Sequence, residues 1–98
     1  MSGLLSKNQL NQKIKTLSNN WVIEGIYLKG NYVFNNFNDA FNFMKEVAIK
    51  CEIMNHHPKW TNVYNKLDVE LYTHDSGGIT EKDFELSLFM DKQFVKFK

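Results

Sequence analysis

The 98-residue chain contains no arginine, one cysteine and one proline. All twelve basic residues are lysines, so the planar guanidinium fork that grips phosphate through two parallel hydrogen bonds is missing. Against 11 acidic residues the formal charge is +1, and direct nucleic-acid binding is not expected. A lone Cys51 excludes an intrachain disulfide and a thiolate-rich metal site, which favours a reducing compartment.

Long apolar runs are also absent. No stretch approaches the roughly 18–20 residues of a membrane span, and the first residues lack the continuous apolar segment of a secretory signal. The sequence therefore predicts no membrane association and a cytoplasmic location, with the nucleus as the alternative. A hydrophobic content of 43% with 14% aromatics indicates a folded protein, and the length predicts one domain over residues 1–98.

The first half of the chain contains a helical pattern followed by two strand-like runs. Leu10, Ile14 and Leu17 recur at helical spacing and predict an amphipathic helix within residues 4–17. Aromatic and β-branched residues then predict strands over residues 21–28 and 31–34, joined by a hairpin turn at Lys29-Gly30.

A second helix is expected to begin at an Asn38 cap. Its predicted inward positions, spaced by three and four, are Phe41, Met44, Val47, Ala48 and Cys51. After Pro58, strands are predicted over residues 60–65 and 67–73 with a turn at Asn65-Lys66.

The segment Thr80 to Asp83 has the form of a capping box and predicts a third helix. Its expected inward side chains are Phe84, Leu88 and Phe89. The order α-β-β-α-β-β-α predicts an α+β fold: a two-layer sandwich in which three helices lie on one face of a four-stranded antiparallel sheet. The open sheet face or an edge strand is a natural place for self-association.

All three histidines, His56, His57 and His74, fall within nineteen residues. Imidazole titrates near neutral pH, so such a group around one small molecule can donate a proton at one atom and accept one at another. Glu52 or Asp83 could orient an imidazole, although Asp83 could equally be only the acidic member of the capping box. The aromatic rings of Trp21, Trp60 and Tyr64 could stack on a flat heterocycle or belong to the core.

Other interpretations of these residues stay open. Three surface histidines can simply be solvated, and three imidazoles can hold a catalytic zinc ion, although neighbouring His56 and His57 make that geometry awkward. No metal site is therefore predicted. Cys51 lies on the apolar stripe of the second helix, which favours a buried, unreactive thiol. Gly77-Gly78 lacks the context of a phosphate-binding loop.

The spacing Glu52-x-x-x-His56-His57-Pro58, with Tyr64, His74 and Asp83 at fixed distances beyond, resembles the signature of the pterin-4a-carbinolamine dehydratases. The stretch from Asn62 to Lys66, the pair Thr73-His74 and the upstream Trp21 are similar to that family too. The resemblance implies an α+β fold of the same element order and a hydro-lyase. This enzyme removes water from 4a-hydroxytetrahydropterin to give quinonoid dihydropterin in tetrahydrobiopterin recycling, and needs no cofactor.

Carried over to this chain, the resemblance implies that His56 and His74 act as general acid and base while His57 mainly holds the pterin. The substrate-binding residues it implies are Glu52, His56, His57, Pro58, Thr73, His74, Asp75, Ser76 and Asp83. Animal members commonly carry an acidic residue where this chain has Asn55, and their loop differs from Asp75-Ser76-Gly77-Gly78.

The resemblance also implies a homodimer or homotetramer. Animal members additionally serve as dimerisation cofactors of a homeodomain transcription factor. A non-catalytic interaction module with such a partner is therefore the alternative to the enzyme, and the three clustered histidines favour the enzyme.

Overall fold

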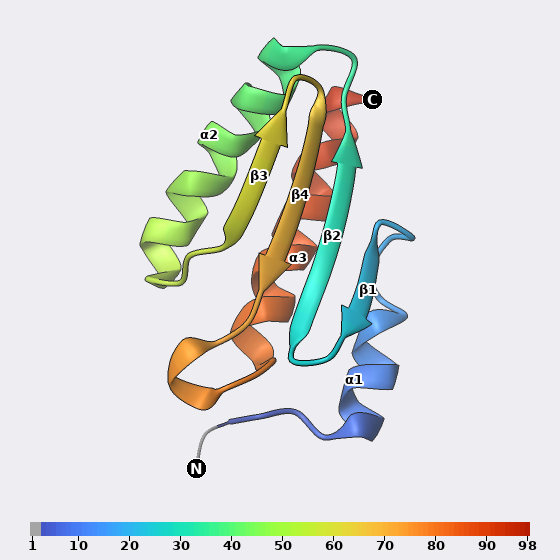
Figure 1. The fold of residues 1–98 in the computed structure, drawn as a ribbon, viewed down its shortest axis with the longest axis vertical. Coiled ribbons are helices and arrows are strands. Elements are labelled where there is room, and N and C mark those ends of the chain that lie inside the picture. Colours follow the sequence, from blue (N-terminus) through green and yellow to red (C-terminus); the bar gives the residue numbers. More distant parts are fainter. Residues whose placement is uncertain (1–2) are drawn as a thin grey trace.

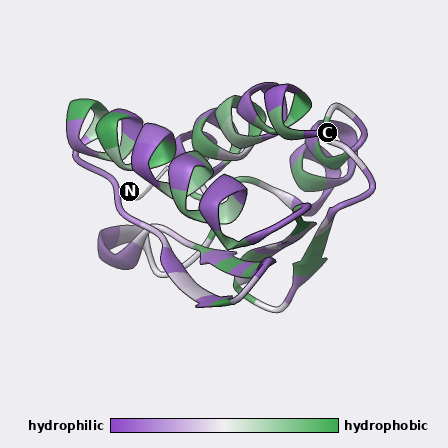
Figure 2. Cartoon of the chain, turned by 90° about the horizontal axis from the view of Figure 1, so that it is seen from above, coloured by the Kyte–Doolittle hydropathy of each residue, from purple (hydrophilic) through white to green (hydrophobic). Residues whose placement is uncertain are grey.

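The computed structural model describes residues 3–98, which fold into one helical layer against one sheet (Figures 1 and 2). The sheet has the order β1-β2-β4-β3 and every neighbouring pair is antiparallel. The elements in chain order are α1 (Lys7–Ile14), β1 (Trp21–Glu24), β2 (Tyr27–Val33), α2 (Phe37–Met54), β3 (Lys59–Val63), β4 (Lys66–Leu71), η1 (His74–Ser76), α3 (Glu81–Phe94) and η2 (Val95–Phe97). The predicted fold class and element order are confirmed.

The predicted capping box of α3 is present, but the predicted cap of α2 is wrong. The Thr80 side chain caps α3, and the Asp83 carboxylate accepts a hydrogen bond from the Thr80 backbone N–H. In α2, the Asn36 side chain accepts from the Asp39 N–H at 2.8 Å, so the cap lies two residues before Asn38 and the helix begins at Phe37. Both asparagines suit a cap, and the extended backbone of Asn36 makes it the one used.

Both predicted hairpin turns lie at other residues. The β1–β2 turn is at residues 25 and 26, where Gly25 has φ 62°, and the predicted turn residues Lys29-Gly30 lie inside β2. Gly30 pairs with Trp21 in the sheet, and a Cβ atom on Gly30 would come within 2.6 Å of the Trp21 ring. This glycine therefore serves close packing rather than a turn. The β3–β4 turn is at Tyr64-Asn65, one residue earlier than predicted.

The core lies between the sheet and the two long helices. Leu28, Tyr32, Leu67, Val69 and Leu71 face it from β2 and β4. The buried residues of α2 are Ala40, Phe43, Val47 and Cys51.

Three of the side chains predicted to face inward do not. Phe41 and Ala48 on α2 are exposed, and Leu88 of α3 is 37% exposed. Apolar residues occupy two faces of α2, so periodicity alone could not decide which face meets the sheet.

A polar cluster under β1 joins the two ends of the chain. The Asp91 carboxylate on α3 accepts hydrogen bonds from the Tyr32 hydroxyl at 2.6 Å, the Trp21 indole N–H at 3.1 Å and both the N–H and hydroxyl of Ser18. Burial and this neighbouring carboxylate raise the pKa of the Tyr32 phenol far above its usual range. The cluster ties β1, β2 and the segment between α1 and β1 to α3.

Within residues 3–98, no helix has the length and apolar character needed to cross a membrane.

Candidate active site at one end of the sheet

The predicted site residues gather at one end of the molecule, shown at the bottom of Figure 1. The C-terminal end of α2, the first residue of β3, the last residue of β4, η1 and the first turn of α3 all meet there. Segments separated by up to thirty residues thus bring side chains together at this end, as a binding site on a two-layer fold requires.

His56 is held in a buried hydrogen-bonded network. Its Nε2 atom lies 2.7 Å from Oδ1 of Asp83, which is completely buried, and His56 itself is only 8% exposed. The second oxygen of Asp83 accepts from the Thr73 hydroxyl at 3.0 Å and from the Thr80 N–H at 2.9 Å. The Thr73 and Thr80 hydroxyls are 2.6 Å apart. A carboxylate with this many donors favours the His56 tautomer that carries its proton on Nε2.

The end of α2 directs the two neighbouring histidines into different surroundings. Asn55 takes the left-handed conformation, with φ 52° and ψ 46°, and its N–H closes the helix on the Cys51 and Glu52 carbonyls. Asparagine tolerates this backbone better than most residues, which gives a conformational reason for asparagine at this position. Beyond it, His56 is buried while His57 is exposed, and half-buried Pro58 leads into β3.

His57 pairs with Glu52 at the surface. Its Nε2 atom lies 2.6 Å from Oε2 of Glu52, but the side chains are 54% and 78% exposed. An exposed pair of this kind contributes little to stability. It orients the His57 ring, which matches the expectation that Glu52 positions an imidazole.

His74 begins η1 and is exposed, and Tyr72 and Thr73 lie between it and the end of β4. Its Nδ1 atom lies 3.1 Å from the hydroxyl of Tyr72. The short loop is closed at its base, because Thr73 pairs with Gly78 and its carbonyl accepts from the Ser76 and Gly77 N–H groups. Asp75 is exposed and Ser76 half-buried within this loop.

His56, Thr73 and Asp83 therefore belong to one buried network, whereas His57 and His74 each belong to a surface pair. Thr73 links the buried network to His74, since its side chain contacts Asp83 while its backbone leads directly to His74. Sequence reasoning missed Thr80 as a member of the network and Tyr72 as a neighbour of His74. The capping-box pattern contained the signal for Thr80, whereas nothing in the sequence marked Tyr72.

The three aromatic residues considered for stacking lie in different places. Trp21 is buried in the core and bonded to Tyr32 and Asp91, so its ring is a core element. Half-buried Trp60 packs against the core from β3. Tyr64 is 62% exposed in the β3–β4 turn, at the far end of β3 from His57 (Figure 1).

Cys51 is buried in α2, as predicted. Burial raises the pKa of the thiol to about 11, which keeps it protonated and a poor nucleophile near neutral pH. Across residues 3–98, no three or more His, Cys, Asp or Glu side chains are grouped closely enough to hold a metal ion.

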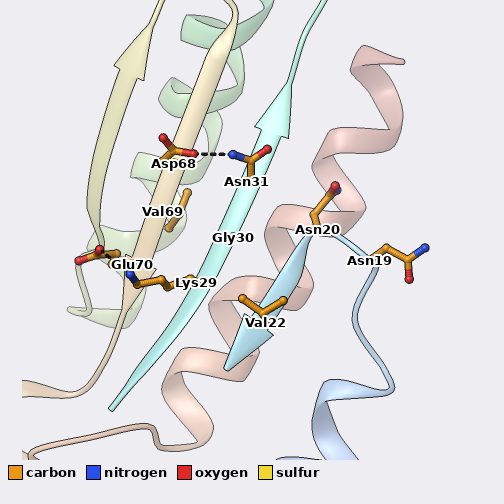
Figure 3. Close-up of a pocket in the computed structure, with 9 residues that line it drawn as sticks. All are labelled: Asn19, Asn20, Val22, Lys29, Gly30, Asn31, Asp68, Val69 and Glu70. Carbon is orange, nitrogen blue, oxygen red and sulfur yellow. Dashed lines mark hydrogen bonds and ion pairs between the residues drawn. The ribbon is translucent and has the colours of Figure 1, made fainter. Parts of the chain in front are cut away.

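One surface hollow lies away from the histidines, on the open face of the sheet (Figure 3). It has a volume of about 560 Å³, and Val22, Asn31 and Asp68 are among its lining residues. Its polar groups already pair with each other, Asn31 with Asp68 and Lys29 with Glu70. A smaller hollow of about 310 Å³ touches the candidate site, where Thr73, Asp75, Ser76 and Thr80 line it. The smaller one is the better candidate because it adjoins the titratable groups.

Comparison with known proteins identifies the family. Residues 3–93 match the family model described as pterin 4 alpha carbinolamine dehydratase. The chain belongs to this family. Among its relatives is a Prochlorococcus marinus protein named "Putative pterin-4-alpha-carbinolamine dehydratase", which is 44% identical over 92 residues, 94% of this chain and 96% of the relative. A protein of the same name from Burkholderia lata is 59% identical over 59 residues, which cover 60% of this chain and 58% of the relative's length.

A solved structure shares the fold of this pterin-4-alpha-carbinolamine dehydratase family member. The Brucella melitensis protein described as "transcriptional coactivator/pterin dehydratase" superimposes with a TM-score of 0.87 at 33% sequence identity. The match covers 91% of this chain and 96% of the Brucella chain. The family and the fold predicted from the sequence are therefore both confirmed.

Proposed function

We propose that the protein dehydrates a 4a-hydroxytetrahydropterin to the quinonoid dihydropterin, acting as a hydro-lyase in tetrahydropterin recycling. The observation that carries the proposal is the contact of His56 with buried Asp83, whose other oxygen binds Thr73, the residue before His74. One carboxylate thus contacts His56 directly and holds the residue from which the His74 loop begins. Family membership and the names of the relatives support the substrate class.

The chemistry needs only proton transfers. The lone pair of the ring nitrogen forms a C=N bond as the C4a–O bond breaks, the departing oxygen takes a proton to leave as water, and the nitrogen loses its own proton. Positioned acid and base groups accelerate such steps by about 10²–10⁴-fold. No redox or metal cofactor is required by this balance of atoms and electrons.

In this proposal His56 and His74 exchange protons with the pterin, and His57, oriented by Glu52, holds it. Pro58, Asp75 and Ser76 complete the binding surface, and Thr73 and Asp83 support it from below. The hollow lined by Thr73, Asp75 and Ser76 adjoins this surface.

Self-association belongs to the same proposal. The outward face of α2 exposes Phe37, Phe41, Ile49 and Ile53, with Ile53 74% exposed. Apolar surface of this extent on one helix favours a contact with a second chain. The coactivator description of the Brucella relative makes a non-catalytic interaction module the second candidate, and this face of α2 is the observation that favours it.

The decisive experiment follows the decay of freshly generated 4a-hydroxytetrahydropterin by absorbance. We expect wild-type protein to accelerate the decay and His74→Ala to fall towards the uncatalysed rate. Lys66→Ala, an exposed change on β4, is the control and should behave as wild type. If folded wild-type protein leaves the decay of several pterins unchanged, the enzyme proposal is wrong and the interaction module becomes the leading candidate.

A further inference from the structure

Tyr72 is the one side chain at the candidate site that neither the sequence nor the proposed reaction assigns a role. It follows the last residue of β4, and its hydroxyl lies 3.1 Å from Nδ1 of His74. The Tyr72 ring is itself held by Tyr27, which packs edge-on with centroids 5.1 Å apart. The hydroxyl is thus presented to His74 by a ring that β2 supports.

Either atom of this contact could be the donor. In one arrangement the phenolic O–H donates to Nδ1, and the neutral imidazole carries its proton on Nε2. In the other, Nδ1–H donates to the phenol oxygen, and Nε2 is bare. The phenolic proton is the more acidic of the two, and the phenol oxygen is a weak acceptor because its lone pair is delocalised into the ring. The first arrangement is therefore favoured, and a hydrogen bond at one imidazole nitrogen decides the state of the other.

The same reasoning can be applied to His56. There, the ring nitrogen that is free to meet the substrate carries no proton, whereas in His74 it does. Asp83 accepts at Nε2 of His56, so Nδ1 of the neutral His56 ring is the bare nitrogen. The neutral His74 ring instead has its proton on Nε2. The two histidines are therefore prepared for different tasks before any substrate binds.

We infer that Tyr72 is a positioning residue that fixes His74 as the Nε2–H tautomer, so that His74 donates a proton and His56 accepts one. This inference rests on the proposed function for its chemical meaning. His74 gives its Nε2 proton to the departing 4a-oxygen while Nδ1 takes the phenolic proton of Tyr72, so the ring stays neutral. The ring-nitrogen proton of the pterin passes to Nδ1 of His56, which then releases it to solvent. Nδ1 of His74 returns its proton to the Tyr72 phenolate, and solvent supplies a new proton to Nε2 of His74.

The direct test is the tautomer itself, measured by ¹⁵N NMR of the imidazole nitrogens at about pH 8.5, two units above the ordinary imidazole pKa. The His74 signals are assigned by their loss in His74→Gln. We expect wild-type His74 to show a protonated Nε2 and a bare Nδ1. Tyr72→Phe keeps the ring against Tyr27 but removes the hydroxyl, and should give His74 a mixture of both tautomers.

Tyr27→Phe is the matched control, since it changes a phenol beside Tyr72 without touching the contact to His74. It should leave the His74 signals as in wild type. In the decay assay, Tyr72→Phe should lower kcat about 10-fold with little change in KM, less than the roughly 10²–10⁴-fold that a whole acid–base group contributes, because His74 itself remains.

The outcomes separate the two proposals. A protonated Nδ1 in wild type, or unchanged His74 signals in Tyr72→Phe, overturns the role of Tyr72 whatever the activity. Expected tautomers with no acceleration of pterin dehydration overturn the proposed function and leave the positioning of His74 by Tyr72 intact.

Discussion

His56 and Asp83 meet through a 2.7 Å contact between Nε2 and Oδ1, although 27 residues separate them in the chain. Asp83 is at the same time the acidic member of the α3 capping box. The alternatives considered from the sequence, a helix cap or a partner for histidine, are both correct. One buried carboxylate thus links the start of a helix to the proposed chemistry.

Replacing Asp83 by Asn tests this double role. The amide has one acceptor oxygen for donors that now occupy two, so we expect a loss of about 1.5–3 kcal/mol in the free energy of unfolding. Urea denaturation measures it. Glu81→Gln is the matched control in the same helical turn, where an exposed ion pair with Lys13 should be worth less than about 1 kcal/mol. Equal stability of Asp83→Asn and wild type would contradict the structural role.

Asp91→Asn should weaken the fold while sparing the site. The carboxylate receives hydrogen bonds from Ser18, Trp21 and Tyr32, and the amide cannot accept them all, so we expect a loss of about 1–3 kcal/mol. Trp21 fluorescence should also change because its N–H partner is altered. Lys92→Ala, at the next and exposed position, is the control. The prediction is wrong if folded Asp91→Asn loses as much dehydration rate as His74→Ala does, because the polar cluster around Asp91 would then affect the candidate site.

The thiol of Cys51 should react slowly in the folded protein. Its pKa is raised by burial to about 11, against about 8.5 for a free thiol, so the folded state keeps the proton longer than the unfolded state. Stability from this group is therefore fully present below about pH 8.5 and declines as the pH rises towards 11. Alkylation at pH 8 should be slow in buffer and fast in denaturant, and fast alkylation of the folded protein would contradict the buried thiol.

The outward face of α2 should control self-association. Placing glutamates at Ile49 and Ile53, which are 65% and 74% exposed, should reduce the sedimenting species to the 11.6 kDa chain without loss of helical content. Lys92→Glu adds a negative charge at an exposed position of α3, away from this face, and is the control. A wild-type protein that itself sediments only as a monomer would count against association.

The helices and strands could be predicted because local chemistry determines them. Thr80 and Asp83 form the predicted capping box, and Leu10, Ile14 and Leu17 pack against the core as their spacing indicates. The position of the first hairpin turn could not be predicted, because Gly25 and Gly30 are equally good turn residues in the sequence. Only the Trp21 ring beside Gly30 distinguishes them, and that contact exists only in the folded sheet.

For the candidate site, too, one part could be predicted from the sequence and another could not. The three histidines, Glu52 and Asp83 were identifiable by residue type and spacing, but their pairing was not. That Asp83 binds His56 and Glu52 binds His57 depends on the left-handed turn at Asn55. Asp91 acts through contacts with residues near the other end of the chain, for which a single sequence carries no local signal. Tyr72 is only two residues from His74, but its ring is supported by Tyr27 on another strand.

Buried and more exposed side chains alternate over residues 71–74, at and after the end of β4, and this alternation means that no residue can be inserted there without changing the site. Leu71 and Thr73 are buried, whereas Tyr72 is half-buried and His74 exposed. One inserted residue between Leu71 and Thr73 would exchange these faces, because successive side chains of an extended chain point to opposite sides. The Thr73 hydroxyl would leave Asp83, and Tyr72 would leave His74. Insertions are better tolerated inside the loop that the Thr73–Gly78 bridge closes, because that bridge holds the base of the loop whatever its length.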